Sequence, residues 1–339
     1  MVQHTPVTPK RWRGWIGTRL DIGIGLSVAG LMLPWLSAAV QSMDLGALPW
    51  LIDLAAHWQI PIAAVLTLCV VIRFFLGARN RLLWLPVLIL PWLIALPRLE
   101  TADQSPGPSV RVANVNLHVS QTDAQGLREF LDREQPEMVV LIELNETMAA
   151  QIATWTDYPE QHLVPENSPF GIGVISRLAL QSATTVRDAK GLAEIDVIVR
   201  VADQPVLLTA AHPMPPLSSS WHRARLTKLM ALVERQQHHA GPRLMVGDLN
   251  ASPWSSAMRA VRADYRRANT LSPTWPNRNF GWFGIPIDLV LASSHWQVQS
   301  FDVAESFGSD HRPVVTTLRL SAASDRSDEP TDLELEHRP

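Results

Sequence analysis

The feature that most constrains this chain is a run of 19 residues, 22–40, without a charged side chain. An α-helix needs about 20 apolar residues to cross the hydrocarbon core of a bilayer, which is about 30 Å thick. A cleaved signal peptide has a shorter apolar core of about 7–15 residues and a cleavage site with small residues. Because further apolar segments follow, the run is better interpreted as a membrane span.

Two more apolar segments follow the first one. The segment from Ala47 to Ile72 is interrupted by Asp53, His57 and Gln59, and the uncharged segment Leu82–Leu96 has only 15 residues. Fifteen residues are fewer than a helix needs to cross the bilayer, and local thinning of the bilayer or helix tilt relieves a mismatch in length at small cost. We therefore expect residues 1–100 to form a membrane anchor with about three transmembrane helices, at about 21–41, 47–75 and 82–98.

The basic residues of this half predict its orientation. No Lys or Arg occurs between residues 20 and 72, and two clusters flank that interval: Lys10, Arg11, Arg13 and Arg19 before it, and Arg73, Arg79 and Arg81 after it. Loops rich in Lys and Arg stay in the cytoplasm. Three crossings then place everything after Arg98 outside the cytoplasm, whereas two crossings would leave it inside. We expect three crossings.

The rest of the chain has a different composition. Residues 1–100 carry a net charge of +4 and residues 101–339 a net charge of −7. We expect a polar linker at 101–109, one large domain at 110–320 and a disordered acidic tail at 321–339. The single cysteine, Cys69, lies in an apolar run, which excludes an intrachain disulfide framework and a cysteine-based zinc site.

Hydrophobic periodicity indicates a domain of many strands and few helices. Helical spacing is found at 123–133 and 221–239, and two alternating runs at 194–200 and 205–211 resemble the arms of a hairpin. Other runs of strand length lie at 110–116, 138–144, 171–176, 243–246, 287–291, 296–301 and 314–320. This pattern favours a sandwich of two sheets flanked by helices.

Polar residues recur where these apolar runs end. They are Asn114 and Asn116 in RVANVNLH, Glu143 in VVLIELNE, His212 after LLTAA, Asp248 and Asn250 in LMVGDLNAS, Asp288 in PIDLVLAS, and Asp310 and His311 in GSDHRPVV. Any one of them has a plain structural explanation, such as capping a turn or a helix. Together they need another explanation, because buried carboxylates must be paired, hydrated or bound to metal.

In these residues the chain resembles the endonuclease/exonuclease/phosphatase superfamily, which has the deoxyribonuclease I-like fold. The blocks RVANVN, VVLIE, a His after a strand, GDLN, ID and SDH follow one another in that family's order, over about residues 108–320. The resemblance implies an α+β fold, a four-layered α/β/β/α sandwich, preceded here by about three transmembrane helices. The N-terminal segments resemble a membrane-bound bacterial subgroup, which implies a multi-pass protein of the bacterial inner (cell) membrane. The orientation predicted from the basic residues then places the catalytic domain in the periplasm.

The resemblance also implies a role for each site residue. Glu143 resembles a Mg²⁺ ligand (Mn²⁺ is an alternative ion), and Asn116 and Asp310 would lie close to the metal. Asn114 would contact these residues rather than the metal. Asp248 resembles the residue that orients or deprotonates the attacking water, and Asn250 a donor to phosphate oxygens. His212 would contact the phosphoryl group or protonate a leaving group. His311 would pair with a carboxylate, which is expected to be that of Asp288.

The expected activity is hydrolysis of a phosphodiester by metal-assisted attack of water, as in a nuclease. A lipid phosphodiesterase resembling a sphingomyelinase, or a phosphomonoesterase, would use the same site. A protein of another class, a membrane-tethered binding protein without catalysis, would have lost Glu143, Asp248 or His311, and all three are present. The partners expected are therefore the membrane and a phosphoester, in a nucleic acid or a phospholipid headgroup, and no protein partner is inferred.

Two basic clusters and one aromatic segment bear on the substrate. The clusters (Arg223, Arg225 and Lys228, and then Arg259, Arg262, Arg266 and Arg267) would suit a phosphate backbone, but a solvated helix face is the favoured interpretation. The net charge of −7 argues against tight nonspecific binding of DNA. The aromatic segment, with Trp275, Phe280, Trp282 and Phe283, would face substrate or bilayer, or pack a loop onto the core.

Overall fold

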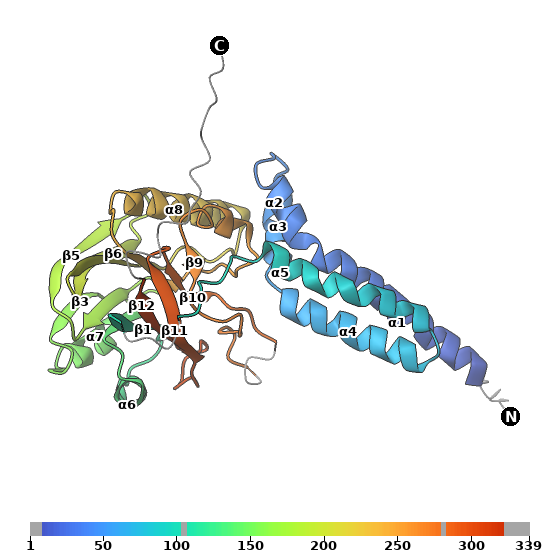
Figure 1. Cartoon of the computed structure of the whole chain (residues 1–339), viewed down its shortest axis with the longest axis horizontal. Helices are drawn as coiled ribbons and strands as arrows, with labels where there is room; N and C mark the ends of the chain where they lie inside the picture. Colours follow the sequence, from blue (N-terminus) through green and yellow to red (C-terminus); the bar gives the residue numbers. More distant parts are fainter. Residues whose placement is uncertain (1–8, 103–106, 279–282, 322–339) are drawn as a thin grey trace, which may run out of the picture.

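The computed structural model describes residues 9–102, 107–278 and 283–321 (Figure 1). Part of the expected linker, nearly all of the expected acidic tail, and Phe280 and Trp282 of the aromatic segment lie outside these residues. A sandwich of two β-sheets is joined to a long bundle of N-terminal helices that extends away from it (Figure 1).

The first sheet has the strand order β11-β12-β1-β2-β4-β3. Its central strands β1 and β2 are parallel, and the other neighbours are antiparallel. The bounds are β1 Ser109–Asn116, β2 Met138–Ile142, β3 Glu160–Val164, β4 Ile172–Ser176, β11 Trp296–Val303 and β12 Val314–Leu320.

The second sheet has the order β5-β6-β7-β8-β10-β9 and the same design, with a single parallel pair, β7 and β8, at its centre. The bounds are β5 Leu180–Arg187, β6 Ala193–Val201, β7 Gln204–Ala210, β8 Arg243–Asp248, β9 Arg266–Arg267 and β10 Asp288–Ala292. The predicted hairpin is confirmed, because β6 and β7 pair antiparallel up to Val201 and Gln204.

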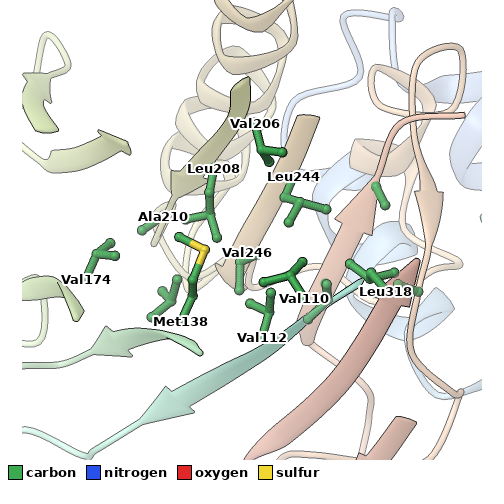
Figure 2. Close-up of a cluster of buried hydrophobic side chains, with 14 of the residues drawn as sticks. Val110, Val112, Met138, Val174, Val206, Leu208, Ala210, Leu244, Val246 and Leu318 are labelled. Atoms are coloured by element: carbon green, nitrogen blue, oxygen red, sulfur yellow. The ribbon is translucent and has the colours of Figure 1, made fainter. Parts of the chain in front are cut away.

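The core lies between the two sheets (Figure 2). Alternate residues of a strand point to opposite faces, so Val110 and Val112 of β1 and Leu244 and Val246 of β8 meet in this layer. Ala113 and Val115 point the other way and contact α6 and α7. This alternation also sets the direction of the polar residues at the strand ends.

Helices cover the outer face of each sheet. Helices α6 (Gln125–Glu134) and α7 (Glu146–Ile152) pack on the first sheet, and α8 (Ser219–Gln237) with the short 3₁₀ helix η2 (Ser256–Arg259) packs on the second. The arrangement is two mixed six-stranded sheets between helices, the deoxyribonuclease I-like fold. The fold class expected for this half is confirmed.

The N-terminal half is helical. Its elements are α1 Pro9–Leu31, α2 Leu33–Val40, α3 Leu48–Ala56, α4 Gln59–Phe75, the 3₁₀ helix η1 Arg79–Ile89 and α5 Leu90–Ile94. A buried apolar cluster with Ile24, Leu66 and Cys69 joins α1 to α4, and Leu85 and Leu88 of η1 pack against it. Cys69 is a free thiol.

Within the residues that the structure describes, no single helix has both the length and the apolar composition of a membrane span. Two helix pairs meet the criterion when each pair is taken together: α1 with α2, bent by 42°, and α3 with α4, bent by 66°. The third segment, expected to span at 82–98, instead forms most of η1 and the five-residue helix α5.

The helical half is not separated from the sandwich by a free linker. Leu96 lies in the buried cluster beneath α8, and its N–H donates to the backbone oxygen of Pro253 at 2.8 Å. Trp50 of α3 donates its indole N–H to the backbone oxygen of Pro216 at 2.7 Å. The N-terminal helices therefore dock directly on the loops of the second sheet.

Candidate active site

The polar residues at the strand ends converge on one edge of the sandwich. The C-terminal ends of the parallel strands β1, β2, β7 and β8 lie at this edge, and β10 begins there because it runs antiparallel to β8. In chain order these strands contribute Asn116, Glu143, His212, Asp248 and Asp288. The edge therefore assembles residues from positions far apart in the sequence.

Strand alternation directs these side chains into the space between the sheets. Asn114 and Asn116 continue the inward-facing series of Val110 and Val112, and Asp248 continues that of Val246. The register also places Asp288 directly opposite Asp248. Two like charges directly opposite are unfavourable in a sheet, so this pair needs positive charge or protons nearby.

His311 supplies positive charge at this position. Its Nδ1 lies 2.8 Å from Oδ2 of Asp288, and the other oxygen of Asp288 accepts from Nδ2 of Asn114 at 3.2 Å. Burial alone would lower the pKa of His311, but the charge of Asp288 and the hydrogen bond to it outweigh burial and raise the pKa to about 10. His311 is thus an imidazolium at neutral pH.

Asp248 lies at the centre of the cluster. Its Oδ2 is 3.7 Å from Nε2 of both His212 and His311 and accepts from Nδ2 of Asn116 at 3.3 Å. Its Oδ1 accepts from the backbone N–H of Asn250 at 2.9 Å. Burial raises the pKa of Asp248 to about 7, and the charge of Asp288 adds to the effect. A carboxyl with a pKa near neutrality suits a general base.

Glu143 is held beside Asp248 through a shared amide. Nδ2 of Asn116 donates to Oε1 of Glu143 at 3.1 Å, and the backbone N–H of Val119 donates to Oε2 at 2.9 Å. Glu143 follows the last residue of β2 and has a φ of 60°. A left-handed backbone is uncommon for a non-glycine residue, and here it turns the chain directly after the strand.

The other residues predicted from the sequence to belong to the site are His212, Asn250 and Asp310. His212 is buried, and its ring lies beside that of Phe170, tilted by 42° with 5.6 Å between centroids. Burial lowers the pKa of His212 to about 4, so it is neutral at pH 7. The side chain of Asn250 donates to the backbone oxygen of Pro213 at 3.0 Å. Asp310 is exposed and accepts from the indole N–H of Trp275 at 2.9 Å.

The donor set fits a hard divalent cation. In the described part of the chain, Asp248, Asp288 and His311 are the one group of three or more His, Cys, Asp or Glu residues whose possible ligand atoms lie within 4.8 Å of one another. His311, kept protonated by Asp288, has no lone pair for a metal, so the carboxylate oxygens are the donors of this group. Glu143 adds a third carboxylate, held to Asp248 through Asn116. Carboxylate and amide oxygens are ligands that Mg²⁺ prefers, and a cation would also relieve the repulsion between Asp248 and Asp288.

Two aromatic residues near the site were not recognised as site residues from the sequence. The Phe170 ring lies beside that of His212, and the centroid of the Trp275 ring lies 6.3 Å from that of His311. Trp275 belongs to the aromatic segment, whereas Phe170 lies in a loop without any sequence signal. Phe283, later in that segment, is 66% exposed.

The first basic cluster does not form the solvated helix face that was expected of it. Arg225 and Lys228 are buried, Arg225 against Asp53 and Lys228 against Asp188 and Glu194. The expectation was wrong because helical spacing does not reveal which cations meet a carboxylate from a distant segment. Arg225 and Lys228 therefore do not form an exposed track for a nucleic-acid backbone.

Two stacked mixed sheets, with carboxylates and histidines gathered at the ends of their parallel strands, define a hydrolase of the deoxyribonuclease I-like class that acts on phosphoester bonds. The sequence comparison agrees with this class. The chain belongs to the Endonuclease/Exonuclease/phosphatase family, whose model matches residues 113–311.

Solved structures show the same fold at low sequence identity. Humanized D. rerio TDP2 is 14% identical with a TM-score of 0.53, over 62% of this chain and 99% of that one. The endonuclease/exonuclease/phosphatase from Beutenbergia cavernae is 19% identical with a TM-score of 0.52, over 64% and 72%. D. rerio TDP2 complexed with single strand DNA product is 14% identical with a TM-score of 0.52, over 62% and 99%. No curated protein sequence matches the chain.

Proposed function

We propose that the protein is a Mg²⁺-dependent phosphodiesterase of the nuclease type. The observation that carries this proposal is the arrangement around Asp248, where a carboxyl with a pKa of about 7 contacts a neutral histidine, a protonated histidine and an amide. Such a cluster combines a proton acceptor, the Asp248 carboxyl, with nitrogen donors gathered around one of its oxygens. That combination is what hydrolysis of a phosphoester requires.

Each residue has a distinct task in this proposal. Asp248 orients the attacking water and accepts its proton. His311, kept protonated by Asp288, and Asn250 donate hydrogen bonds to phosphoryl oxygens, while neutral His212 contacts the phosphoryl group or the leaving oxygen. Glu143 with Asn116 would hold Mg²⁺, which would supply Lewis-acid polarisation of the phosphoryl group and charge neutralisation. Asp310 was expected near the metal, and that role remains a proposal.

A nucleic acid is the first substrate class to test. The same fold appears in a TDP2 structure that is complexed with a single strand DNA product. A phospholipid headgroup is the second class, because the site belongs to a chain with an apolar helical half. Phosphomonoesters would use the same groups with a different leaving oxygen.

A substrate panel on the full chain tests the activity. Purified protein in detergent is incubated with Mg²⁺ and either single- or double-stranded DNA, RNA, a phospholipid or a small phosphomonoester, with Asp248→Asn as the matched inactive control. We expect cleavage of a diester that EDTA abolishes. If no diester is cleaved by the wild type above the control, the proposal is wrong. Cleavage of the phosphomonoester alone would then favour a phosphomonoesterase, and no cleavage of any substrate would favour the catalytically silent binding protein.

We also propose that the helical half anchors the protein in the bacterial inner membrane with the sandwich in the periplasm. Large apolar side chains on its helices are exposed, among them Leu26 (69%), Phe75 (79%) and Leu83 (79%). Such a surface is typical of contact with lipid or a partner. The chain runs along the bundle as α1, returns as α4, and runs along it again as η1 with α5. The start of α1 and the sandwich therefore lie at opposite ends of the bundle (Figure 1).

The basic residues support this orientation. Arg73 and Arg81 both pair with Asp21 at 2.9 Å, and the end of α4 and the start of η1 lie at the end of the bundle away from the sandwich (Figure 1). Alkaline phosphatase fused after Pro339 is expected to be active, and the same reporter fused after Gly77 is expected to be silent. The opposite pattern would place the sandwich in the cytoplasm.

A further inference from the structure

A buried carboxylate of the helical half, that of Asp53, lies at the contact with the sandwich. Asp53 of α3 is fully buried. Its Oδ1 accepts from the backbone N–H of Ser256 at 2.6 Å and from the hydroxyl of Ser37 at 2.9 Å. Its Oδ2 accepts from the hydroxyl of Ser255 at 2.9 Å. A carboxylate in an apolar helix thus has its partners in α2 and in the family domain.

The cation that compensates Asp53 comes from α8. Nη2 of Arg225 donates to Oδ2 of Asp53 at 2.7 Å, and both side chains are fully buried. His57 and His222 border the pair, with ring nitrogens 3.4 Å and 3.6 Å from the same carboxylate oxygen. Because a buried ion left without its partner is strongly destabilising, α3 and α8 are held to each other at this point.

Arg225 also reaches the candidate active site. Its second terminal nitrogen, Nη1, donates to the backbone oxygen of Asn250. Asn250 lies two residues after Asp248, has a left-handed φ of 49° and donates its own N–H to Oδ1 of Asp248. One guanidinium therefore connects the carboxylate of α3 to the loop that carries two of the proposed catalytic groups.

We propose that Asp53 and Arg225 are positioning residues for the hydrolytic site and that docking of α3 sets the backbone of the Asp248–Asn250 loop. The inference rests on the proposed function. Neither residue contacts the substrate in this account. Asp53 fixes the rotation of the Arg225 guanidinium, and the guanidinium fixes the carbonyl of Asn250 in an otherwise strained backbone conformation. The N-terminal helices are then a structural part of the enzyme as well as its anchor.

A mere ion pair between two segments would stabilise the fold but would leave the loop unaffected. The distinction matters because a misplacement of about 1 Å at a catalytic group can cost about 100-fold in rate. Asp21 offers a matched control. It is also a carboxylate in an N-terminal helix, and it binds Arg73 and Arg81 without a hydrogen bond to any residue of the sandwich among the described residues.

The first experiment compares Asp53→Asn with Asp21→Asn in the full chain in detergent. For Asp53→Asn we expect kcat on the most active diester to fall about 10- to 100-fold with KM changed less than about threefold. Hydrogen–deuterium exchange of residues 247–251 should become faster in Asp53→Asn and stay at the wild-type rate in Asp21→Asn. The exchange measurement tests the coupling between Asp53 and this loop even if no diester proves to be a substrate. Failure of this inference can therefore be told apart from failure of the proposed function.

A double variant separates positioning from stability. Asp53→Asn/Arg225→Met removes both buried charges, which restores much of the thermal stability lost in Asp53→Asn. It also lacks the bond to the Asn250 carbonyl, so we expect kcat to stay low and loop exchange to stay fast. Recovery of kcat and of loop protection along with stability would overturn the inference, as would equal exchange of the loop in Asp53→Asn and Asp21→Asn.

Discussion

Asp248 and Asp288 face one another across two antiparallel strands, and His311 lies within 3.7 Å of both carboxylates. The geometry explains why a histidine is needed at this position. Burial raises the free energy of each carboxylate, and a protonated imidazole offsets that cost only while it keeps its own hydrogen bond to Asp288. The site is therefore a balance among the charges of three buried side chains.

This balance predicts a pH dependence of stability in EDTA. The pKa of His311 is raised to about 10, above its value of about 6.5 in an unfolded chain. A raised pKa contributes stability that is fully present below pH 6.5 and is lost as the pH rises to about 10. In the window from pH 7 to 10, denaturation should show a loss on the order of a few kcal/mol in the free energy of unfolding.

The variant Asp288→Asn isolates the cause of this slope. Without the carboxylate the pKa of His311 falls, so the free energy of unfolding should change much less between pH 7 and 10. His212, with a pKa of about 4, does not titrate in this window, and Asp248, with a pKa of about 7, titrates only in its lowest part, so the two proteins are compared by their slopes between pH 8 and 10. Equal slopes in the wild type and in Asp288→Asn would contradict the assigned pairing.

At the scale of elements, the end of β8 approaches the end of β7 so closely that only glycine fits between them. Gly247 has a φ of 155°, and a Cβ there would lie 1.9 Å from the backbone oxygen of Ala211. Gly247 precedes Asp248 and Ala211 precedes His212. The close approach of these two strands therefore sets the distance between two residues of the candidate site.

We expect Gly247→Ala to force β7 and β8 apart. The substitution should lower the free energy of unfolding by at least about 3 kcal/mol, because the new methyl group meets backbone, which cannot move aside as a side chain can. In a thermal melt this lowers the Tm by about 5 °C or more. The control is Gly25→Ala, because a Cβ at Gly25 meets no atom within 4 Å. An unchanged Tm in Gly247→Ala would show that the strands are not packed as described.

Strands with a continuous apolar run were predictable, and weakly patterned elements were not. The runs that became β1, β2, β8 and β10 are apolar because both of their faces are covered. The missed strand β5 is mostly polar and half-exposed, and the missed helix α7 has only seven residues. Edge strands and short helices carry too little buried surface to leave a periodic signal.

At the scale of the whole molecule, the sequence predicted which residues share a site but not how the two halves meet. The order of the family blocks was enough to bring Asn116, Glu143, Asp248 and Asp288 to one edge. Asp53 appeared only as an interruption of an apolar run, because its partner Arg225 lies 172 positions later. Contacts at such separation depend on tertiary packing, which local periodicity does not encode.

Metal binding should stabilise the whole chain. Mg²⁺ that binds the folded state alone, at about 100 times its Kd, contributes about 2.7 kcal/mol, which raises the Tm by about 5 to 10 °C. We expect this increase in a thermal melt of the full chain in detergent, and its loss in Glu143→Gln. A Tm that is unaffected by Mg²⁺, or an equal increase in Glu143→Gln, would contradict the proposed metal ligands.

We propose that the cluster around Asp248 hydrolyses phosphodiesters. The most direct measurement is the initial rate of Mg²⁺-dependent diester cleavage by the full chain, compared with Asp248→Ala and His311→Ala at equal concentration of folded protein. Because loss of one such group typically costs 10²- to 10³-fold, we predict a decrease of at least about 100-fold in each variant. Wild-type rates in both variants would contradict the account.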